Sequence, residues 1–236
     1  MKTRGEGIVV ASPLETSRMI NMTTTDPTGR TRIWFIRHGE SEANRNLHLV
    51  SGRSNYTPLS PAGREQAQAL GVALLDCDYL PDAIYTSPAL RTVTTADLAL
   101  RAMGITDSAQ PDDRLQELDQ GRWTGLSRDQ VYSVTNQAAI AAAGVDFRPP
   151  GGESMHDVGL RMHEWALDIA TQHRGGAVLA FTHGVAIRCL IGLEENWPEE
   201  RIWQTRTENT SVTSMSVTGN VITLDFHNRS AHELAN

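Results

Sequence analysis

The sequence has few of the features that mark disulfide-rich, zinc-binding or membrane proteins. Its 236 residues include two cysteines, Cys77 and Cys189, which form neither a C-x-x-C pair nor a zinc-like spacing. We therefore expect two reduced, mostly buried thiols. No run approaches the roughly 20 apolar residues of a membrane helix, and the stretch GIVVAS is too short for the apolar part of a signal peptide. The simplest expectation is a cytoplasmic protein without membrane association.

Positive charge is also scarce. The chain has 21 Lys and Arg residues against 28 Asp and Glu residues, a formal net charge of -7. A general basic face, which nucleic acids and anionic membranes require, is therefore not expected. A local cationic pocket is still compatible with this balance. The apolar fraction of 39% is ordinary for a globular protein and predicts a substantial core.

Composition divides the chain into three parts. Residues 1–30 are rich in Thr, Ser, Gly and Asp without a sustained period, which predicts a flexible or irregular arm. Residues 31–228 carry regular patterns and no internal repeat, so we expect one domain there, as a monomer or a homodimer. Residues 229–236 are expected to be a short C-terminal tail.

Buried strands and capped helices alternate through the expected domain. Apolar runs predict strands at 33–36, at 83–86 and in the stretch GAVLAFTHG, 176–184. Helical patterns follow Ser60-Pro61, Ser87-Pro88 and Ser154, each serine read as an N-cap, and cover 127–144 and 185–192. A period-two pattern around Gly219-Asn220 predicts a hairpin. The expected fold class is α/β, in three layers, with a mostly parallel central sheet, helices on both faces and an antiparallel edge strand.

Polar residues follow three of these strands directly. WFIRHG places Arg37 and His38 at one strand end, LAFTHG places His183 at another, and TSPALR places Arg91 at the start of a helix after the third. Ligands of open α/β sheets bind at the carboxyl ends of the strands. Two arginines and two histidines at one spot would repel each other unless an anion lay between them, and a tetrahedral phosphate suits this set of donors. The sequence therefore predicts an anion pocket at these strand ends.

The chain also resembles a known family, the histidine phosphatase superfamily, which includes cofactor-dependent phosphoglycerate mutase. The matching segments, in family order, are RHGESEAN (37–44), LSPAGREQA (59–67), SPALRTVTTA (87–96), LQELDQGRWTG (115–125), PGGES (150–154) and THG (182–184). Thr182 replaces the usual serine, and Thr124 replaces the glutamate of a GxWEG pattern, which affects loop packing more than chemistry.

The resemblance implies the roles of the site residues. His38 would be the nucleophile that carries the phosphoryl group as phosphohistidine, and Glu117 would be the general acid and base. The expected phosphate-binding residues are Arg37, Arg91, His183, Asn44 and Gly184. Ser51 and Gly52 match a family loop that touches substrate, although a plain turn is nearly as good an interpretation.

The implied activity is hydrolysis of a small phosphorylated metabolite, without metal and without another cofactor. The alternative is a phosphoglycerate mutase, which returns the phosphoryl group to its substrate. The segment between Glu117 and GGES is shorter than the mutase insertion and offers only Arg122, Arg128 and Arg148 for a substrate carboxylate, so we favour a phosphatase. A non-catalytic phosphate-binding module would lack the nucleophile or the acid, and a metal site is disfavoured because Arg37 lies beside His38. The substrate is left open, with specificity expected from residues 45–58, residues 121–152 and possibly the N-terminal arm.

Overall fold

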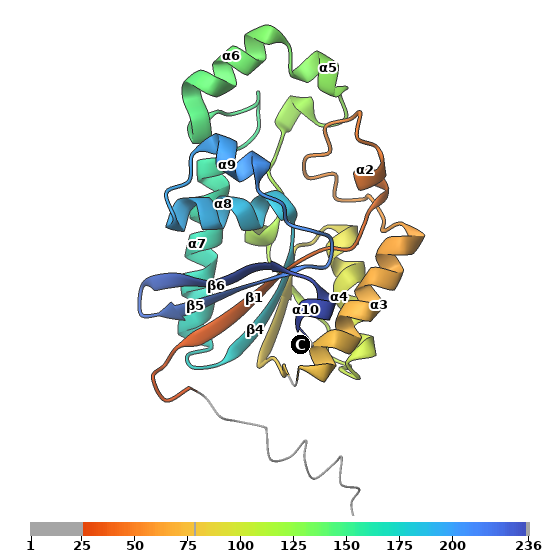
Figure 1. The fold of residues 1–236 in the computed structure, drawn as a ribbon, viewed down its shortest axis with the longest axis vertical. Helices are drawn as coiled ribbons and strands as arrows, with labels where there is room; N and C mark the ends of the chain where they lie inside the picture. The colour runs from red at the N-terminus through yellow and green to blue at the C-terminus, as the bar shows by residue number, and fades with distance from the viewer. Residues whose placement is uncertain (1–25, 78, 235–236) are drawn as a thin grey trace, which may run out of the picture.

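Alternating side chains along the first strand pack on both faces of one central sheet. The computed structural model describes residues 26–77 and 79–234, and Figure 1 shows helices on either side of this sheet. The strands run in the order β3-β2-β4-β1-β5-β6. Their bounds are β1 Thr31–Arg37, β2 Ala83–Thr86, β3 Gln110–Pro111, β4 Ala177–Thr182, β5 Val212–Thr218 and β6 Val221–Arg229.

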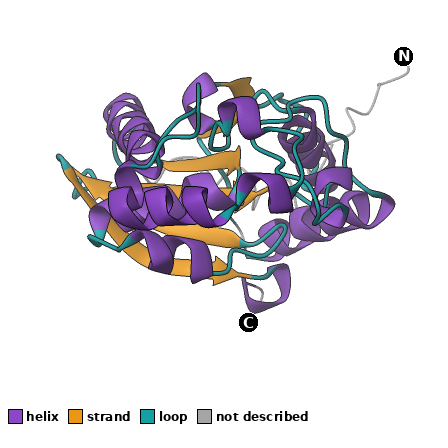
Figure 2. Cartoon of the chain, turned by 90° about the horizontal axis from the view of Figure 1, so that it is seen from above, coloured by secondary structure: helices purple, strands orange, loops and turns teal. Residues whose placement is uncertain are grey.

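The helices complete a three-layer α/β fold. The α-helices are α2 Glu42–Arg45, α3 Pro61–Asp76, α4 Leu90–Ala102, α5 Arg128–Val131, α6 Val134–Ala143, α7 Met155–Gln172, α8 Gly184–Glu194, α9 Glu199–Gln204 and α10 Ala231–Leu234. Three short 3-10 helices are η1 Asp113–Leu115, η2 Gly121–Trp123 and η3 Gly144–Asp146. Figure 2, seen from above, shows the strands lying between helices.

Strand β1 shows why both faces are covered. Ile33 and Phe35 belong to an apolar cluster with α7 and α8, whereas Trp34 and Ile36 belong to a second cluster with α3 and α4. Successive side chains of a strand point to opposite faces, so a continuous apolar run requires a helical layer on each side. The predicted fold class is therefore confirmed.

Pairing directions also agree with the sequence pattern. β1 pairs in parallel with β4, β4 with β2, and β2 with β3. β5 pairs antiparallel with β1 and with β6, and the turn between them contains Gly219, whose φ is +59°. The C-terminal hairpin is thus confirmed, with β6 as the edge strand.

Two of the three serine caps were predicted correctly. The Ser60 side chain accepts from the Gly63 N–H, and Ser154 forms a capping box with Asp157. Ser87 is not an N-cap: α4 begins at Leu90 after Ala89, which makes no side-chain cap. The predicted start of this helix was therefore wrong, because the Ser87 side chain is directed to another partner described below.

The pattern at 127–144 was only partly correct. It forms two helices, α5 and α6, separated at Tyr132 and Ser133, and Ser127 and Ser133 each cap one of them. Figure 1 shows both helices at the top of the molecule, beyond the sheet. The expected loop at 147–154 is present and carries the chain from η3 to α7.

Outside the domain core, the described segments are short. Asp26 begins the described chain, and its N–H donates to the Gly175 carbonyl. The expected arm at 1–30 lies mostly outside the described residues, and the boundaries of the arm, domain and tail stay predictions. Among residues 26–77 and 79–234, no helix combines the length and apolar character that a membrane crossing requires.

Candidate active site

The sheet order brings the three polar strand ends together. β4 lies between β1 and β2, so the residues that follow these strands are neighbours at one edge. His38 follows β1 and His183 follows β4, and the centroids of their rings are 5.2 Å apart. Arg91, in the first turn of α4, reaches both rings. The convergence inferred from the strand ends is present.

His38 is held in one tautomer. Its Nδ1 lies 2.7 Å from the Gly39 carbonyl oxygen, which can only accept, so Nδ1 carries the proton. Its Nε2 accepts from Arg91 Nε at 3.2 Å. Burial, reinforced by the charges of Arg91 and Arg37, lowers the pKa of His38 well below its ordinary value. The ring is therefore neutral, with its free electron pair on the Nε2 side that faces the arginine.

His183 has the opposite arrangement. Its Nδ1 accepts from Arg91 Nη2 at 3.1 Å, so its Nε2 carries the proton and donates to Ser87 Oγ at 2.8 Å. The side chain is fully buried, and burial followed by the charge of Arg91 lowers the pKa of His183. Ser87, predicted as a helix cap, is instead the partner that orients this imidazole.

The Arg91 guanidinium is positioned by a loop as well as by the histidines. Nη1 donates to the Ser54 carbonyl at 2.9 Å, and Nη2 donates to the Arg53 carbonyl at 3.1 Å. The side chain is buried, and burial lowers the pKa of Arg91. Its ordinary pKa is so high that the group stays cationic. It is thus a fixed positive charge beside His38 Nε2.

Arg37 lies on the other side of the pocket. Its Nη1 donates to the Thr207 carbonyl, while its buried Nε has no hydrogen-bond partner in the described chain. Gly184, the first residue of α8, leaves the space for this guanidinium, because a Cβ there would lie 3.2 Å from Arg37 Nε. The two residues therefore fit against each other at the α8 N-terminus, where the helix dipole adds positive potential.

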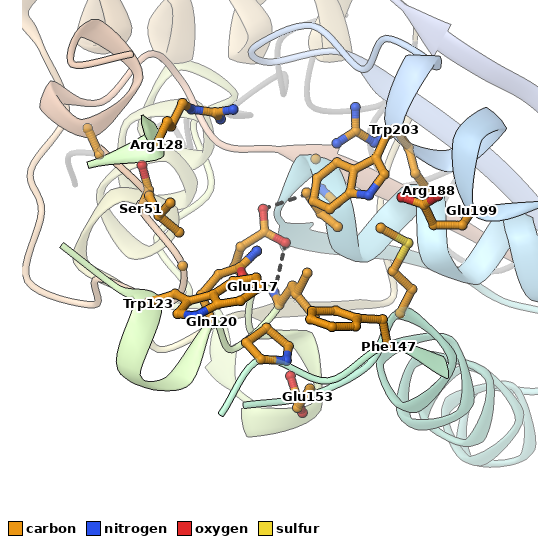
Figure 3. Close-up of a pocket in the computed structure, with 18 of the residues that line it drawn as sticks. Ser51, Glu117, Gln120, Trp123, Arg128, Phe147, Glu153, Arg188, Glu199 and Trp203 are labelled. Carbon is orange, nitrogen blue, oxygen red and sulfur yellow. Dashed lines mark hydrogen bonds between the residues drawn. The ribbon is translucent and has the colours of Figure 1, made fainter. Parts of the chain in front are cut away.

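Glu117 faces the same helix terminus. Its carboxylate accepts the N–H groups of Leu118 at 2.9 Å, Ala186 at 3.1 Å and Val185 at 3.3 Å. Figure 3 shows it in the middle of the residues that line the cavity. Within the described residues, the hydrogen bonds that hold this carboxylate come from backbone N–H groups.

The remaining predicted residues line the cavity but differ in their contacts. Asn44 Oδ1 accepts from the Ser41 N–H and from Asn209 Nδ2, which leaves the Asn44 NH₂ group without a bond in the described chain. Ser51 and Gly52 also line the cavity. Gly52 has φ of +50°, and a Cβ there would lie 2.6 Å from Thr124 Oγ1, so this position requires glycine for the turn itself.

An ion-pair group supports the loop that holds Arg91. Glu153 Oε1 accepts from Arg53 Nη2 at 2.9 Å and from Arg161 Nε at 3.1 Å. Glu153 directly precedes the Ser154 cap, and its side chain joins the 51–55 loop to α7. Its signal in the sequence is weak, because Arg53 lies 100 positions away along the chain.

One cavity of about 770 Å³ is bordered by most of the predicted residues, namely Arg37, His38, Asn44, Ser51, Gly52, Arg91, Glu117 and Gly184. His183 is fully buried and is not part of the cavity lining. Sequence reasoning missed several lining residues, including Arg188, Trp203 and Phe147. Arg188 had a usable signal, because it is the only charged residue in the apolar run VAIRCLIG. Within the described chain, no group of three or more His, Cys, Asp or Glu side chains is arranged to hold a metal ion.

Known proteins are similar to this chain in sequence and in fold. The family model of the histidine phosphatase superfamily (branch 1) matches residues 33–230. A 2,3-bisphosphoglycerate-dependent phosphoglycerate mutase of Rhizobium meliloti (strain 1021) is 33% identical over 173 residues, which cover 71% of this chain and 81% of the relative.

Two solved structures extend the comparison. A mycobacterial glucosyl-3-phosphoglycerate phosphatase is 26% identical with a TM-score of 0.71, covering 85% of this chain and 100% of that one. YhfR of Bacillus stearothermophilus is 29% identical with a TM-score of 0.75, covering 86% of this chain and 99% of that one.

Proposed function

The chain belongs to the histidine phosphatase superfamily, and from this premise we propose that it hydrolyses a small phosphomonoester through a phosphohistidine on His38. The observation that carries the proposal is the tautomer of His38. Nδ1 donates to the Gly39 carbonyl, and the neutral Nε2 faces the cationic Arg91. A neutral imidazole nitrogen next to a fixed cation is suited to attack on phosphorus.

In the first step, His38 Nε2 forms a bond to phosphorus while the bond from phosphorus to the alcohol oxygen breaks. Arg91 Nε, now 3.2 Å from Nε2, has to exchange this contact for a phosphoryl oxygen. Arg37 Nε and the Asn44 NH₂ group, which have no partner among the described residues, would supply further donors. Phosphoryl transfer depends mainly on such positioning and charge stabilisation.

When phosphate binds, the ring proton of His183 would move from Nε2 to Nδ1. The Ser87 hydroxyl can accept from Nε2 or donate to it. If Ser87 donates, His183 carries its proton on Nδ1, the nitrogen that now faces Arg91. It then presents an N–H to a phosphoryl oxygen.

Glu117 would move the protons. Entering the reaction as the carboxylic acid, it gives its proton to the departing alcohol oxygen, and the resulting carboxylate then removes a proton from the water that attacks phosphohistidine. Its position at the α8 N-terminus supports this role, because the Val185 and Ala186 N–H groups hold the carboxylate beside the phosphate site. Ser51 and Gly52 would contact the alcohol portion of the substrate.

Trapping of the intermediate tests this proposal. Brief mixing with a ³²P-labelled phosphomonoester and quenching in base should leave label on the wild type as acid-labile phosphohistidine. His38→Ala should carry no label, whereas His156→Ala, at an exposed histidine paired with Asp146, should be labelled like the wild type. Turnover should persist in EDTA. Label on His38→Ala, or none on the wild type across a panel of phosphomonoesters, would contradict the proposal.

A mutase activity is the second candidate, supported by the names of relatives such as the Rhizobium meliloti protein. Of the three arginines expected to be available for a carboxylate, only Arg128 lines the cavity, and Arg188 joins it there. Phosphorus NMR of 3-phosphoglycerate with 2,3-bisphosphoglycerate decides between the two. Faster formation of 2-phosphoglycerate than of inorganic phosphate would favour the mutase.

A further inference from the structure

The cavity has two chemically different zones. Its floor carries the phosphate-directed groups Arg37, His38 and Arg91, together with Glu117. In the proposed reaction a phosphoryl group would occupy only this floor, whereas a volume of about 770 Å³ is in the range that accommodates a drug-sized ligand. Most of the cavity is therefore available to the alcohol portion of the substrate.

One wall of this larger zone is a preformed aromatic surface. The rings of Trp123 and Phe147 are stacked with centroids 5.4 Å apart and an interplanar angle of 29°. Tyr132 meets the Trp123 ring edge-on at 6.2 Å. Trp123 and Phe147 pack with Val50 in a small apolar cluster of their own. Trp123 is only 9% exposed and Phe147 is partly buried, so this packing holds both rings rigidly where they line the cavity.

A third ring comes from a separate element. Trp203 of α9 lines the cavity, and 38% of its surface is exposed. In the view of Figure 3, Trp203 lies on one side of the Glu117 carboxylate, and Trp123 and Phe147 lie on the other. An exposed tryptophan at a ligand cavity is suited to be covered by an apolar partner.

Charges near these rings are only partly engaged by other groups of the described chain. Glu153 pairs with Arg53 and Arg161, and the Arg128 guanidinium lies 5.7 Å from the centre of the Tyr132 ring. Arg188 donates to the Thr205 carbonyl through Nη1, while its buried Nε has no hydrogen-bond partner in the described chain. A short alcohol bearing several charges would leave the aromatic wall uncovered, whereas a planar ring would cover it.

We propose that the alcohol portion of the substrate is a planar, largely apolar ring system that packs against Trp123 and Phe147 and reaches toward Trp203. The inference rests on the proposed phosphatase activity and adds the substrate class. The ring binds while its phosphoryl group lies on the floor beside His38, so ring binding contributes to selection among phosphomonoesters and not to the transfer step itself.

The test compares phosphomonoesters of primary alcohols, so that the reactivity of the leaving group changes little. The series is propyl, benzyl and 1-naphthylmethyl phosphate, with 3-phosphoglycerate as the small charged competitor. We expect kcat/KM to rise along the series, by roughly 30-fold from propyl to naphthylmethyl, because ring burial adds to ring–ring contact. The rise should be mainly in KM.

Variants connect this preference to the wall. Trp123→Leu and Phe147→Leu keep apolar bulk but remove the ring, and each should reduce the naphthylmethyl-to-propyl ratio to about a third or less. Tyr56→Ala removes an aromatic ring that is 93% exposed and outside the cavity lining, and it should leave the ratio as in the wild type. Melting temperatures check the fold of each variant. Inhibition by 1-naphthylmethylphosphonate and propylphosphonate gives the same comparison without turnover.

Failure of this inference is separable from failure of the proposed function. If the wild type forms phosphohistidine but prefers propyl phosphate or 3-phosphoglycerate, or if the ring-free variants keep the naphthyl preference, the aromatic substrate class is wrong. If no phosphohistidine forms with any ester of the series, the phosphatase proposal fails as well.

Discussion

At the residue scale, the site keeps two histidines neutral in a cationic surrounding. His38 is 3% exposed and His183 is fully buried, and the pKa of each is lowered by burial first and then by the charge of Arg91. In the unfolded chain both imidazoles have a pKa near 6.5. Below that pH, the unfolded chain binds protons that the folded chain does not.

This difference predicts that acid destabilises the protein before its carboxylates titrate. The stabilisation is full above about pH 6.5, and between pH 6.5 and 5 the free energy of unfolding should fall by about 1.4 kcal/mol per pH unit for each of the two histidines. Urea unfolding at several pH values measures the slope. In His183→Gln the slope should decrease by the contribution of one histidine, about 1.4 kcal/mol per pH unit. An unchanged slope would show that His183 is protonated in the folded state.

The sequence predicted individual site residues where a short motif places a polar side chain directly after a buried strand. Arg37, His38, Arg91 and His183 followed from strand ends, because parallel strands align their carboxyl ends. The partner of His183 did not follow, because Ser87 before a proline is also a good cap signal. Which of two local roles a serine takes depends on the neighbouring strand, and that neighbour is unknown until the sheet order is known.

At the element scale, α3 packs unusually close to the loop that carries the nucleophile. A Cβ on Gly63, in the first turn of α3, would overlap the Glu40 carbonyl, and one on Gly39 would overlap the Gly63 carbonyl. The Ser60 cap and Pro61 set the direction in which α3 starts. The glycine of LSPAGREQA is therefore a contact between this helix and the His38 loop.

Gly63→Ala tests this contact, because we expect it to destabilise the protein although a Gly-to-Ala change in a helix usually stabilises it. Alanine normally stabilises a helix interior by about 0.5–1 kcal/mol relative to glycine. Here the added methyl must displace backbone, and overpacking of this kind costs about 1–3 kcal/mol. Because the displaced loop carries His38, kcat should also fall, by about a hundredfold for a shift near 1 Å.

Urea unfolding and steady-state kinetics measure both effects. Gln68→Ala, on the exposed face of the same helix, is the control and should change neither by much. A stabilised, fully active Gly63→Ala would mean that α3 can move away without affecting the site.

Elements were more predictable than their ends. The alternation of buried strands and capped helices was enough to predict the three layers, because a sheet that is buried on both faces is compatible with few folds. The period-two pattern near the C-terminus was enough to predict the hairpin. The break between α5 and α6 was not apparent in an unbroken helical composition, and only the caps Ser127 and Ser133 reveal it. The aromatic wall was also missed, because Trp123 and Phe147 lie 24 positions apart in segments that look like ordinary loops.

At the scale of the whole molecule, the site depends on segments that are joined only by tertiary contacts. The 51–55 loop holds Arg91 through the Arg53 and Ser54 carbonyls, and Glu153 holds that loop to α7. Burial opposes ionisation of Glu153, yet the hydrogen bond and charge of Arg161 lower its pKa below the ordinary value. Stability from this carboxylate is therefore present above about pH 4.3 and is lost as the pH falls through its lowered pKa.

Glu153→Gln should therefore affect stability and phosphate binding together. It removes the Glu153 charge from Arg53 and Arg161, of which Arg53 keeps a longer contact of 3.7 Å with Asp119. Breaking a partly buried pair of this kind costs about 2–4 kcal/mol at pH 7. Asp168→Asn, which alters an ion pair with Arg114 at a 58% exposed aspartate, should cost less than about 1 kcal/mol. Because the loosened loop no longer fixes Arg91, KM should rise in Glu153→Gln and not in the control.

The pH dependence of the stability difference between the wild type and Glu153→Gln shows whether the loss comes from the ion pair or from altered packing. The gap in unfolding free energy between the wild type and Glu153→Gln should be full at pH 7 and shrink as the pH falls below about 4.3, since the wild-type carboxylate then takes up a proton as well. A gap that stays constant into acid would mean that the glutamine disturbs shape and not charge. The joining of the Arg91 loop to α7 would then not depend on the charge of Glu153.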